Sequence, residues 1–252
     1  MSVSEVAVRL SARQNFFMTK TFTRPGVQAA IDLSRDTTNN ARWQHVFDRY
    51  EEMLRTKGGN ELVDLNTKCN HILWMDKKPF LTREELMALV EWKFRKGKPR
   101  YALRKLLLGN SESFVLDCTR SGLKAADRGD ILEAVDELCQ LRGVGPATAS
   151  AILSFRRPDL CPFMDDEVIE ALYNGKRGYT TCIFFEITNE CKQIASKLDG
   201  WTPCKVGMAL WTAARLKACS IDVLDMDNPC TKRHGETLSS AQRGMKRRRR
   251  QR

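Results

Sequence analysis

A glycine-rich bend between two apolar segments is the first feature that could bind a ligand. Gly143, Val144 and Gly145 follow an apolar periodic run that ends at Leu141, and Pro146 comes directly after them. Glycine permits a turn that side chains would block, and proline suits the first position of a helix, where a missing N–H costs nothing. The amides of the bend and the start of the next helix form an anion site, so the sequence predicts phosphate binding here.

A second feature is a set of carboxylates that a proline-bounded loop delivers to the start of another helix. Pro158 and Pro162 lie in the loop, and Asp165, Asp166 and Glu167 follow it. Acids in the first turn stabilise a helix N-terminus by about 0.3–1 kcal/mol each. Asp165 or Asp166 is therefore a candidate N-cap, whatever else these carboxylates do.

Together, the bend and the aspartate resemble the helix-hairpin-helix DNA glycosylase superfamily, which includes endonuclease III and the mismatch-adenine glycosylases. The similarity covers about residues 130–175 and includes the Thr148-Ala149 pair and the apolar Ala151-Ile152-Leu153. It implies an all-α, two-lobed fold with the helix-hairpin-helix motif at 130–155. It also implies that the amides of Gly143, Val144 and Gly145 hold a DNA phosphate, which fixes register without reading sequence.

The same resemblance implies that Asp165 is the catalytic aspartate. A carboxylate stabilises the oxocarbenium character of a sugar that loses its base, and it can orient or deprotonate the attacking water. Bifunctional members carry a Schiff-base lysine two positions after the second glycine, where this chain has Ala147. Lys124 and Lys176, the closest lysines in sequence, are not in register. The resemblance therefore implies a monofunctional glycosylase without β-lyase activity.

The acids after Asp165 depart from the family pattern, which usually has a small or polar residue and then Asn or His. Asp166 and Glu167 stand there instead, and Glu170 adds charge that would repel a phosphate backbone. Two functions stay open: a base-excision DNA glycosylase, and a catalytically inactive nuclear module that binds DNA or a protein partner. An open, aromatic-lined pocket beside Asp165 favours the first. A plugged pocket, with Asp165 bonded to helix N–H groups, favours the second.

Basic residues are unevenly distributed. The net charge is +11, of which residues 231–252 carry +8 and the rest of the chain only +3. Two basic clusters in this tail look like a bipartite nuclear-localisation signal and predict a nuclear protein that binds an import receptor. The same charges would add salt-sensitive affinity for any polyanion. The clusters are Lys232 and Arg233, then Lys246, Arg247, Arg248, Arg249 and Arg250.

The densest basic segment in the rest of the chain spans residues 93–105. Lys96, Lys98 and Arg100 are candidate contacts to DNA phosphates, and aromatic residues between them are candidate stacking rings. The alternative is a helix with aromatic residues in the core and solvated charges outside. Helical spacing favours that alternative for Phe94.

Cysteine usage and hydropathy bound the remaining possibilities. Nine cysteines at irregular spacings, with no CxxC pair, indicate reduced and mostly buried thiols. The last four are separated by 13, 15 and 11 positions, which matches no compact cluster loop. We expect no metal, no cofactor and no membrane span, and we expect a monomer.

Periodic apolar segments predict the elements that position these residues. Strand-type alternation is scarce, so we expect an all-α fold. Residues 1–38 are predicted to be a flexible terminus, with a mitochondrial presequence as the alternative; 39–220 a helical domain; and 221–252 a disordered basic tail. The expected helices are 41–57 (stopped by Gly58-Gly59), one opened by a Thr82/Glu85 capping box, 101–108, 113–123, 130–141, 146–155, 166–173, 180–198 and 203–218.

Overall fold

The fold is all-helical. In a computed structural model, residues 25–173, 175 and 177–226 are described, and they contain helices, turns and loops without a β-strand. The helical elements, in chain order, are α2 (Pro25–Arg35), α3 (Asn40–Phe47), α4 (Tyr50–Asn70), the π-helix η1 (His71–Met75), α5 (Arg83–Lys96), α6 (Tyr101–Leu108), α7 (Glu112–Asp127), α8 (Ile131–Cys139), α9 (Pro146–Arg156), α10 (Asp166–Leu172), α11 (Thr181–Ala195) and α12 (Pro203–Met226). The predicted all-α class is confirmed.

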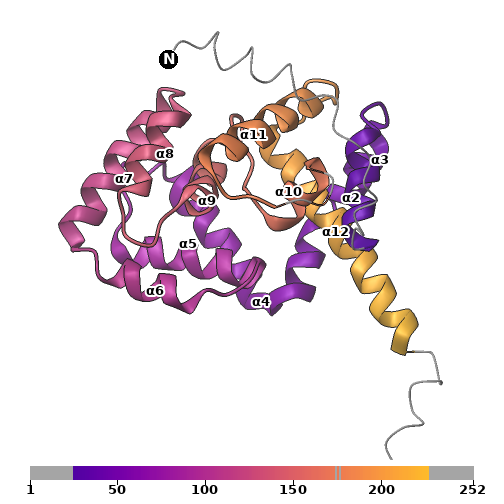
Figure 1. The fold of residues 1–252 in the computed structure, drawn as a ribbon, viewed down its shortest axis with the longest axis horizontal. Coiled ribbons are helices and arrows are strands. Elements are labelled where there is room, and N and C mark those ends of the chain that lie inside the picture. The colour runs from indigo at the N-terminus through magenta and orange to yellow at the C-terminus, as the bar shows by residue number, and fades with distance from the viewer. Residues whose placement is uncertain (1–24, 174, 176, 227–252) are drawn as a thin grey trace, which may run out of the picture.

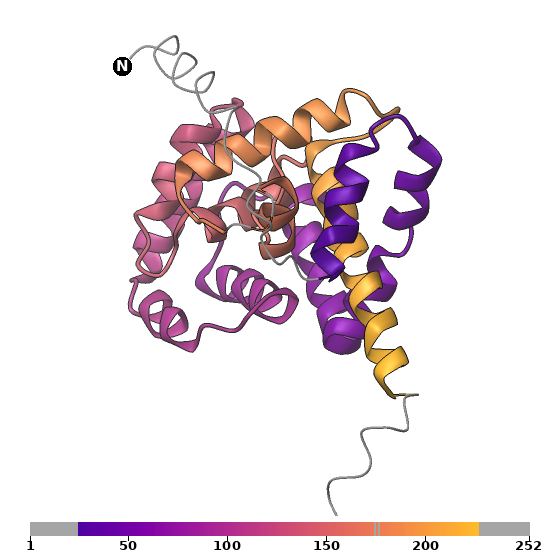
Figure 2. The ribbon, with the colours of Figure 1, turned by 45° about the vertical axis from the view of Figure 1, so that its right-hand side comes forward.

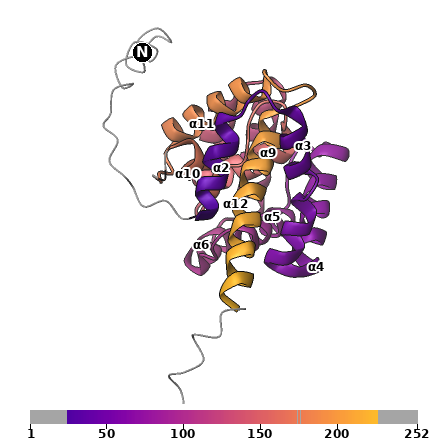
Figure 3. The ribbon, with the colours of Figure 1, turned by 90° about the vertical axis from the view of Figure 1, so that its right-hand side faces the viewer.

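The helices form two groups with α9 and α10 between them. Figure 1 shows α6, α7 and α8 at one end of the molecule and α2, α3 and α12 at the other. Figures 2 and 3 show α2 lying along α12. The core contains several large, fully buried side chains, including Trp43, Phe184 and Trp211. Between the groups, α9 packs against α7 and α8, and α10 packs against α2 and α12.

Local capping signals in the sequence place the starts of several helices. Thr82 accepts from the Glu85 N–H, and the Glu85 side chain accepts from the Thr82 N–H, so the predicted capping box is complete. Asp130 accepts from the Glu133 N–H at 3.0 Å and starts α8. Thr202 accepts from the Lys205 N–H at 3.2 Å before α12. These contacts fix the helices that carry the candidate site.

Two predicted domain boundaries need correction. The segment 25–38 was expected to be flexible, yet it contains α2, whose Val27, Ala30, Ile31 and Leu33 are buried. This helix is stabilised by packing against α12, a partner almost two hundred residues away in the chain, which local sequence patterns do not reveal. The last helix continues to Met226, beyond the expected end of the domain at 220. Residues 1–24 and 227–252 lie outside the described part of the chain.

The first predicted helix is divided differently from expectation. Residues 41–57 were expected to form one helix, but α3 ends at Phe47 and α4 begins at Tyr50. Gly58 and Gly59 leave helical geometry, with φ of −144° and +70°, and the chain then resumes its helix to Asn70. The glycines therefore form a kink within α4. In the described residues, the helices are too short or too polar to cross a membrane.

Candidate nucleic-acid interface

The bend between α8 and α9 has the geometry of a helix hairpin. Gly143 has a φ of +85°, and a Cβ at this position would lie 2.9 Å from the Leu103 carbonyl oxygen. Gly145 has extended backbone, and a Cβ there would have no heavy atom within 4 Å. Glycine is therefore required at 143 by conformation and packing. At 145 it leaves open space in front of the start of α9.

The backbone N–H groups of the hairpin differ in whether they are free to donate to a bound anion. The Val144 N–H donates to the Leu141 carbonyl at 3.0 Å, so the expected Val144 contact to phosphate is wrong for its amide. The N–H groups of Gly143 and Gly145 make no hydrogen bond to other described residues. An anion site at this bend therefore has two backbone donors and the positive end of the α9 dipole.

A buried asparagine holds the hairpin in place. The Asn110 amide donates to the Arg142 carbonyl at 3.0 Å, and the Arg142 N–H donates back to the Asn110 side-chain oxygen at 3.0 Å. The same amide donates to the Leu107 carbonyl at 2.9 Å. Asn110 thus ties the end of α6 to the bend, a role the sequence analysis missed because nothing local connects residues 110 and 142.

A cleft of about 400 Å³ lies against the hairpin. We call it the hairpin cleft. Gly143 to Thr148 line it together with Lys98 and Arg100, whose side chains are exposed, and with Asp165. The structure therefore brings the predicted phosphate-binding bend, two of the three predicted basic residues and the predicted aspartate to one cavity.

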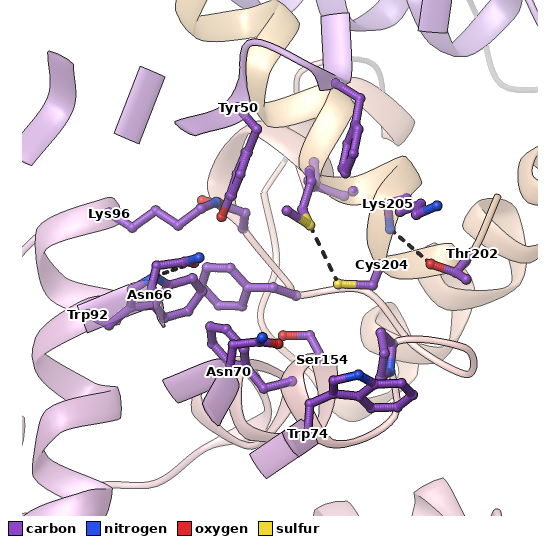
Figure 4. A pocket seen from close by; sticks show the side chains of 18 of the residues that line it. Tyr50, Asn66, Asn70, Trp74, Trp92, Lys96, Ser154, Thr202, Cys204 and Lys205 are labelled. Atoms are coloured by element: carbon purple, nitrogen blue, oxygen red, sulfur yellow. Dashed lines mark hydrogen bonds and ion pairs between the residues drawn. The ribbon is translucent and has the colours of Figure 1, made fainter. Parts of the chain in front are cut away.

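A second cavity of about 390 Å³ adjoins the first, since Asp165 and Phe163 line both. We call it the aromatic pocket. Figure 4 shows rings of Tyr50, Trp74 and Trp92 around it, together with the amides of Asn66 and Asn70. The Trp92 indole N–H donates to the Asn66 oxygen at 3.1 Å, which leaves the Asn66 NH₂ group as a donor in the lining. The size and the mixture of rings with a few polar groups suit a small planar ligand.

Asp165 sits at the junction of these cavities and is not a free carboxylate. Its side chain is 3% exposed and forms an ion pair with the Lys96 ammonium, whose side chain is also 3% exposed. The Trp211 ring centroid lies 4.1 Å from the ammonium and that of Phe163 lies 5.2 Å from it. Lys96 was expected to contact DNA phosphate from the surface. That expectation is wrong, because burial and Asp165 hold its charge inside the protein.

Asp165 also caps α10. One of its oxygens accepts from the Asp166 N–H at 2.9 Å. Both features that would distinguish the two functions are therefore present: a solvent-accessible aromatic pocket beside Asp165, and a hydrogen bond from Asp165 to a helix N–H. The cap uses one oxygen and the ion pair uses the other.

The other acids of α10 have basic partners. Arg177 pairs with Asp166 at 3.2 Å and with Glu170, and the Tyr179 hydroxyl donates to Asp166 at 2.8 Å. Glu167 pairs with Arg215 at 3.7 Å. The sequence predicted that these acids repel a phosphate backbone. Their compensation by nearby cations reduces this repulsion.

Two ionisable groups near Asp165 have pKa values that differ from the ordinary ones. Burial and the negative charge of Asp165 raise the pKa of Glu167 to about 7. Burial and the positive charge of Arg100 lower the pKa of Lys93, on α5, to about 8, although Asp165 and Asp166 oppose this shift. Lys93 lines the hairpin cleft. Perturbed groups of this kind, close together beside a cavity, are typical of functional sites.

The aromatic residues of the basic segment divide as their spacing indicated. Phe94 and Trp92 are buried, which confirms the core interpretation for Phe94. Tyr101 is 74% exposed at the start of α6, and it does not line the hairpin cleft or the aromatic pocket. The nuclear-localisation residues between 232 and 250 lie outside the described part of the chain.

Comparison with known proteins identifies one feature. Residues 128–155 match the helix-hairpin-helix motif. Neither the curated proteins nor the solved structures yielded a match for this chain. The motif begins directly after α7 and spans α8, the bend and all of α9 except its last residue. It suggests that the protein binds nucleic acid.

Proposed function

We propose that the protein is a base-excision DNA glycosylase that hydrolyses an N-glycosidic bond with the help of the Asp165 carboxylate. The observation that carries this proposal is the position of Asp165, which lines both the hairpin cleft and the aromatic pocket. A nucleotide whose phosphate lies at the hairpin and whose base lies in the aromatic pocket would place its sugar near this carboxylate.

Each step of this arrangement has a physical reason. A base must leave the stack before its glycosidic bond can be reached, and stacking on aromatic rings offsets part of the cost. The amides of Gly143 and Gly145, with Lys98 and Arg100, would hold the backbone phosphates. As the bond to the base weakens, the sugar gains positive charge, which the nearby carboxylate stabilises.

The test is cleavage of duplexes that carry a panel of damaged or mismatched bases, followed by alkali to break abasic sites. The decisive variant is Asp165→Asn, because asparagine keeps an N-cap oxygen for α10 but has no charge. The matched control is Asp166→Asn, which changes the neighbouring acid. We expect product from the wild type and from the control, and at least about a hundredfold less from Asp165→Asn. Equal product from both variants, with both folded, contradicts the proposal.

A second candidate function is a catalytically inactive module that binds DNA or a protein partner. Two contacts favour it: the Asp165 cap of α10 and the Lys96 ammonium, which neutralises the carboxylate. This candidate predicts DNA binding without product on any duplex of the panel.

We also propose a nuclear location, which rests on the basic clusters in residues 232–250. Import would depend on Lys232-Arg233 and on Lys246 to Arg250 together. A fluorescent fusion with either cluster changed to alanine is expected to lose nuclear accumulation. Nuclear accumulation that survives both changes contradicts the proposal.

A further inference from the structure

We propose that Lys93 is an amine nucleophile that forms a Schiff base with the aldehyde of an abasic sugar in the hairpin cleft. The protein would then break abasic DNA strands as well as remove bases. The inference deepens the proposed function, because base removal at this site would supply the abasic sugar. It reverses the expectation, drawn from Ala147, that the chain lacks a lysine for this chemistry.

The position of Lys93 carries the proposal. Lys93 lines the same cleft as Gly143, Gly145 and Asp165. Ala147 lines that cleft too, so the lysine on α5 and the position on α9 that lacks one share a single cavity. A sugar whose phosphate is held at the hairpin would therefore lie in the cavity that Lys93 enters.

The surroundings of Lys93 favour the neutral amine, which is the nucleophilic form. Its side chain makes no ion pair or hydrogen bond with any residue in the described part of the chain, so no carboxylate lies within ion-pair distance of its nitrogen. Burial and Arg100 bring its pKa to about 8, so about a tenth of the amine is unprotonated at pH 7. Lysines that are desolvated or placed beside another cation are the ones that form Schiff bases in enzymes.

Lys96, one helical turn further along α5, is a poorer candidate. Its side chain pairs with the Asp165 carboxylate among aromatic rings, and it does not line the hairpin cleft. The pair has a second consequence. Because Lys96 compensates Asp165, less negative charge is left to keep Lys93 protonated. Lys96 thus neutralises the Asp165 carboxylate, and Lys93 provides the nucleophilic amine.

The reaction needs only water. The Lys93 nitrogen attacks C1′ of the open-chain sugar, a C–N bond forms, and loss of the C1′ oxygen as water gives the imine. Removal of a proton from C2′ then leaves an electron pair that forms the C2′=C3′ double bond, and the C3′–O bond breaks with departure of the 3′ phosphate. Asp165 and Asp166 both line the cleft and are the nearby carboxylates for this proton. Hydrolysis of the imine returns the free lysine.

The experiment uses the full-length protein and a duplex with a preformed abasic site, so that it does not depend on base removal. Borohydride reduces an imine to a stable amine and links the protein to DNA. We expect a covalent adduct on a denaturing gel, and mass spectrometry of the linked peptide is expected to locate it at Lys93. Strand breakage without alkali is expected in parallel.

Three variants separate chemistry from folding. Lys93→Arg keeps the positive charge but has no amine that can form an imine, and it is expected to lose at least about tenfold of the adduct. Lys105→Arg, at an exposed lysine outside the cleft, is the matched control and is expected to keep it. The double variant Lys93→Arg/Ala147→Lys returns an amine to the cleft from α9. It is expected to regain adduct, which would show that the Lys93→Arg protein still folds and binds abasic DNA.

The outcomes distinguish this inference from the proposed function. Adduct on abasic DNA without base removal from any lesion supports Lys93 and contradicts the glycosylase proposal. Base removal without adduct supports the glycosylase proposal and contradicts the role of Lys93. A wild-type protein that gives no adduct, or an adduct unchanged in Lys93→Arg, overturns the inference.

Discussion

The Lys96 ammonium and the Asp165 carboxylate form a buried ion pair that joins the last turn of α5 to the start of α10. The pair lies where the two cavities meet, because Lys96 lines the aromatic pocket and Asp165 lines both the pocket and the hairpin cleft. Its two residues are 69 positions apart. This contact therefore depends on the whole fold, and the candidate site depends on the contact.

Removing one partner of this pair is expected to destabilise the protein strongly. Lys96→Met keeps a similar side-chain length but leaves the Asp165 charge buried without compensation, which typically costs about 3–5 kcal/mol. Denaturant unfolding measures this change. Lys98→Met, at an exposed position, is the control and is expected to change stability by less than about 0.5 kcal/mol. Equal effects of the two variants would show that the pair contributes nothing.

Glu167 is expected to make the protein less stable as the pH rises from about 4.5 to 7. Its pKa is raised to about 7 from an ordinary value of 4.5, so the folded protein holds a proton that the unfolded chain has released in this window. Stability falls with pH wherever the folded state binds more protons. Glu167→Gln removes this loss and is expected to be more stable than the wild type at pH 8 by about 1–3 kcal/mol.

Unfolding of both proteins at pH 4.5 and at pH 8 measures this difference. The two proteins are expected to be similar at the lower pH and to separate at the higher one. Glu133→Gln, at an exposed carboxyl that pairs with Arg128 on the surface, is the control and is expected to show no such separation. A wild type whose stability advantage over Glu167→Gln grows with pH would exclude a raised pKa for Glu167.

Features that depend on neighbours in the chain could be predicted from the sequence. The Thr82 capping box, the helix 101–108 and the hairpin followed by a Pro146 helix are all local patterns, and each is present. The cap role of Asp165 was also visible, since an aspartate before a helix is a common N-cap. Its second role was not, because the partner is on another helix.

The burial of Lys96 shows why the remaining predictions failed. A lysine in a basic run was interpreted as a surface residue, since charged side chains are rarely buried without a partner. One signal was available: Leu89, Trp92 and Lys96 have helical spacing and all three are buried. Periodicity alone places Lys96 toward the core but does not name the acid that makes its burial tolerable. The hydrogen bonds of Asn110 to Arg142 were not predictable either, because the two residues are 32 positions apart.

Lys98 and Arg100 are expected to contribute to DNA affinity through charge. The logarithm of the binding constant for duplex DNA falls linearly with the logarithm of the salt concentration. Each phosphate that the protein neutralises makes this slope steeper by about 0.9. Lys98→Gln/Arg100→Gln is therefore expected to lower that slope by about 2. Fluorescence anisotropy of a labelled duplex at several salt concentrations measures it. Arg104→Gln/Lys105→Gln removes two exposed charges outside the cleft, and an equal effect of this pair would refute the assignment.

The two hairpin glycines are expected to respond differently to the same substitution. Gly143→Ala places a Cβ 2.9 Å from the Leu103 carbonyl at a φ of +85°, so it is expected to destabilise the fold by about 1–3 kcal/mol. Gly145→Ala adds a methyl group to open space on extended backbone, and its effect on stability is expected to stay below about 1 kcal/mol.

The new methyl group of Gly145→Ala would stand where a phosphate approaches the bend. Loss of one hydrogen bond to a charged oxygen corresponds to about tenfold weaker DNA binding. Thermal unfolding and DNA titration of both variants together test this separation, and unchanged DNA affinity in a stable Gly145→Ala protein would place the phosphate elsewhere.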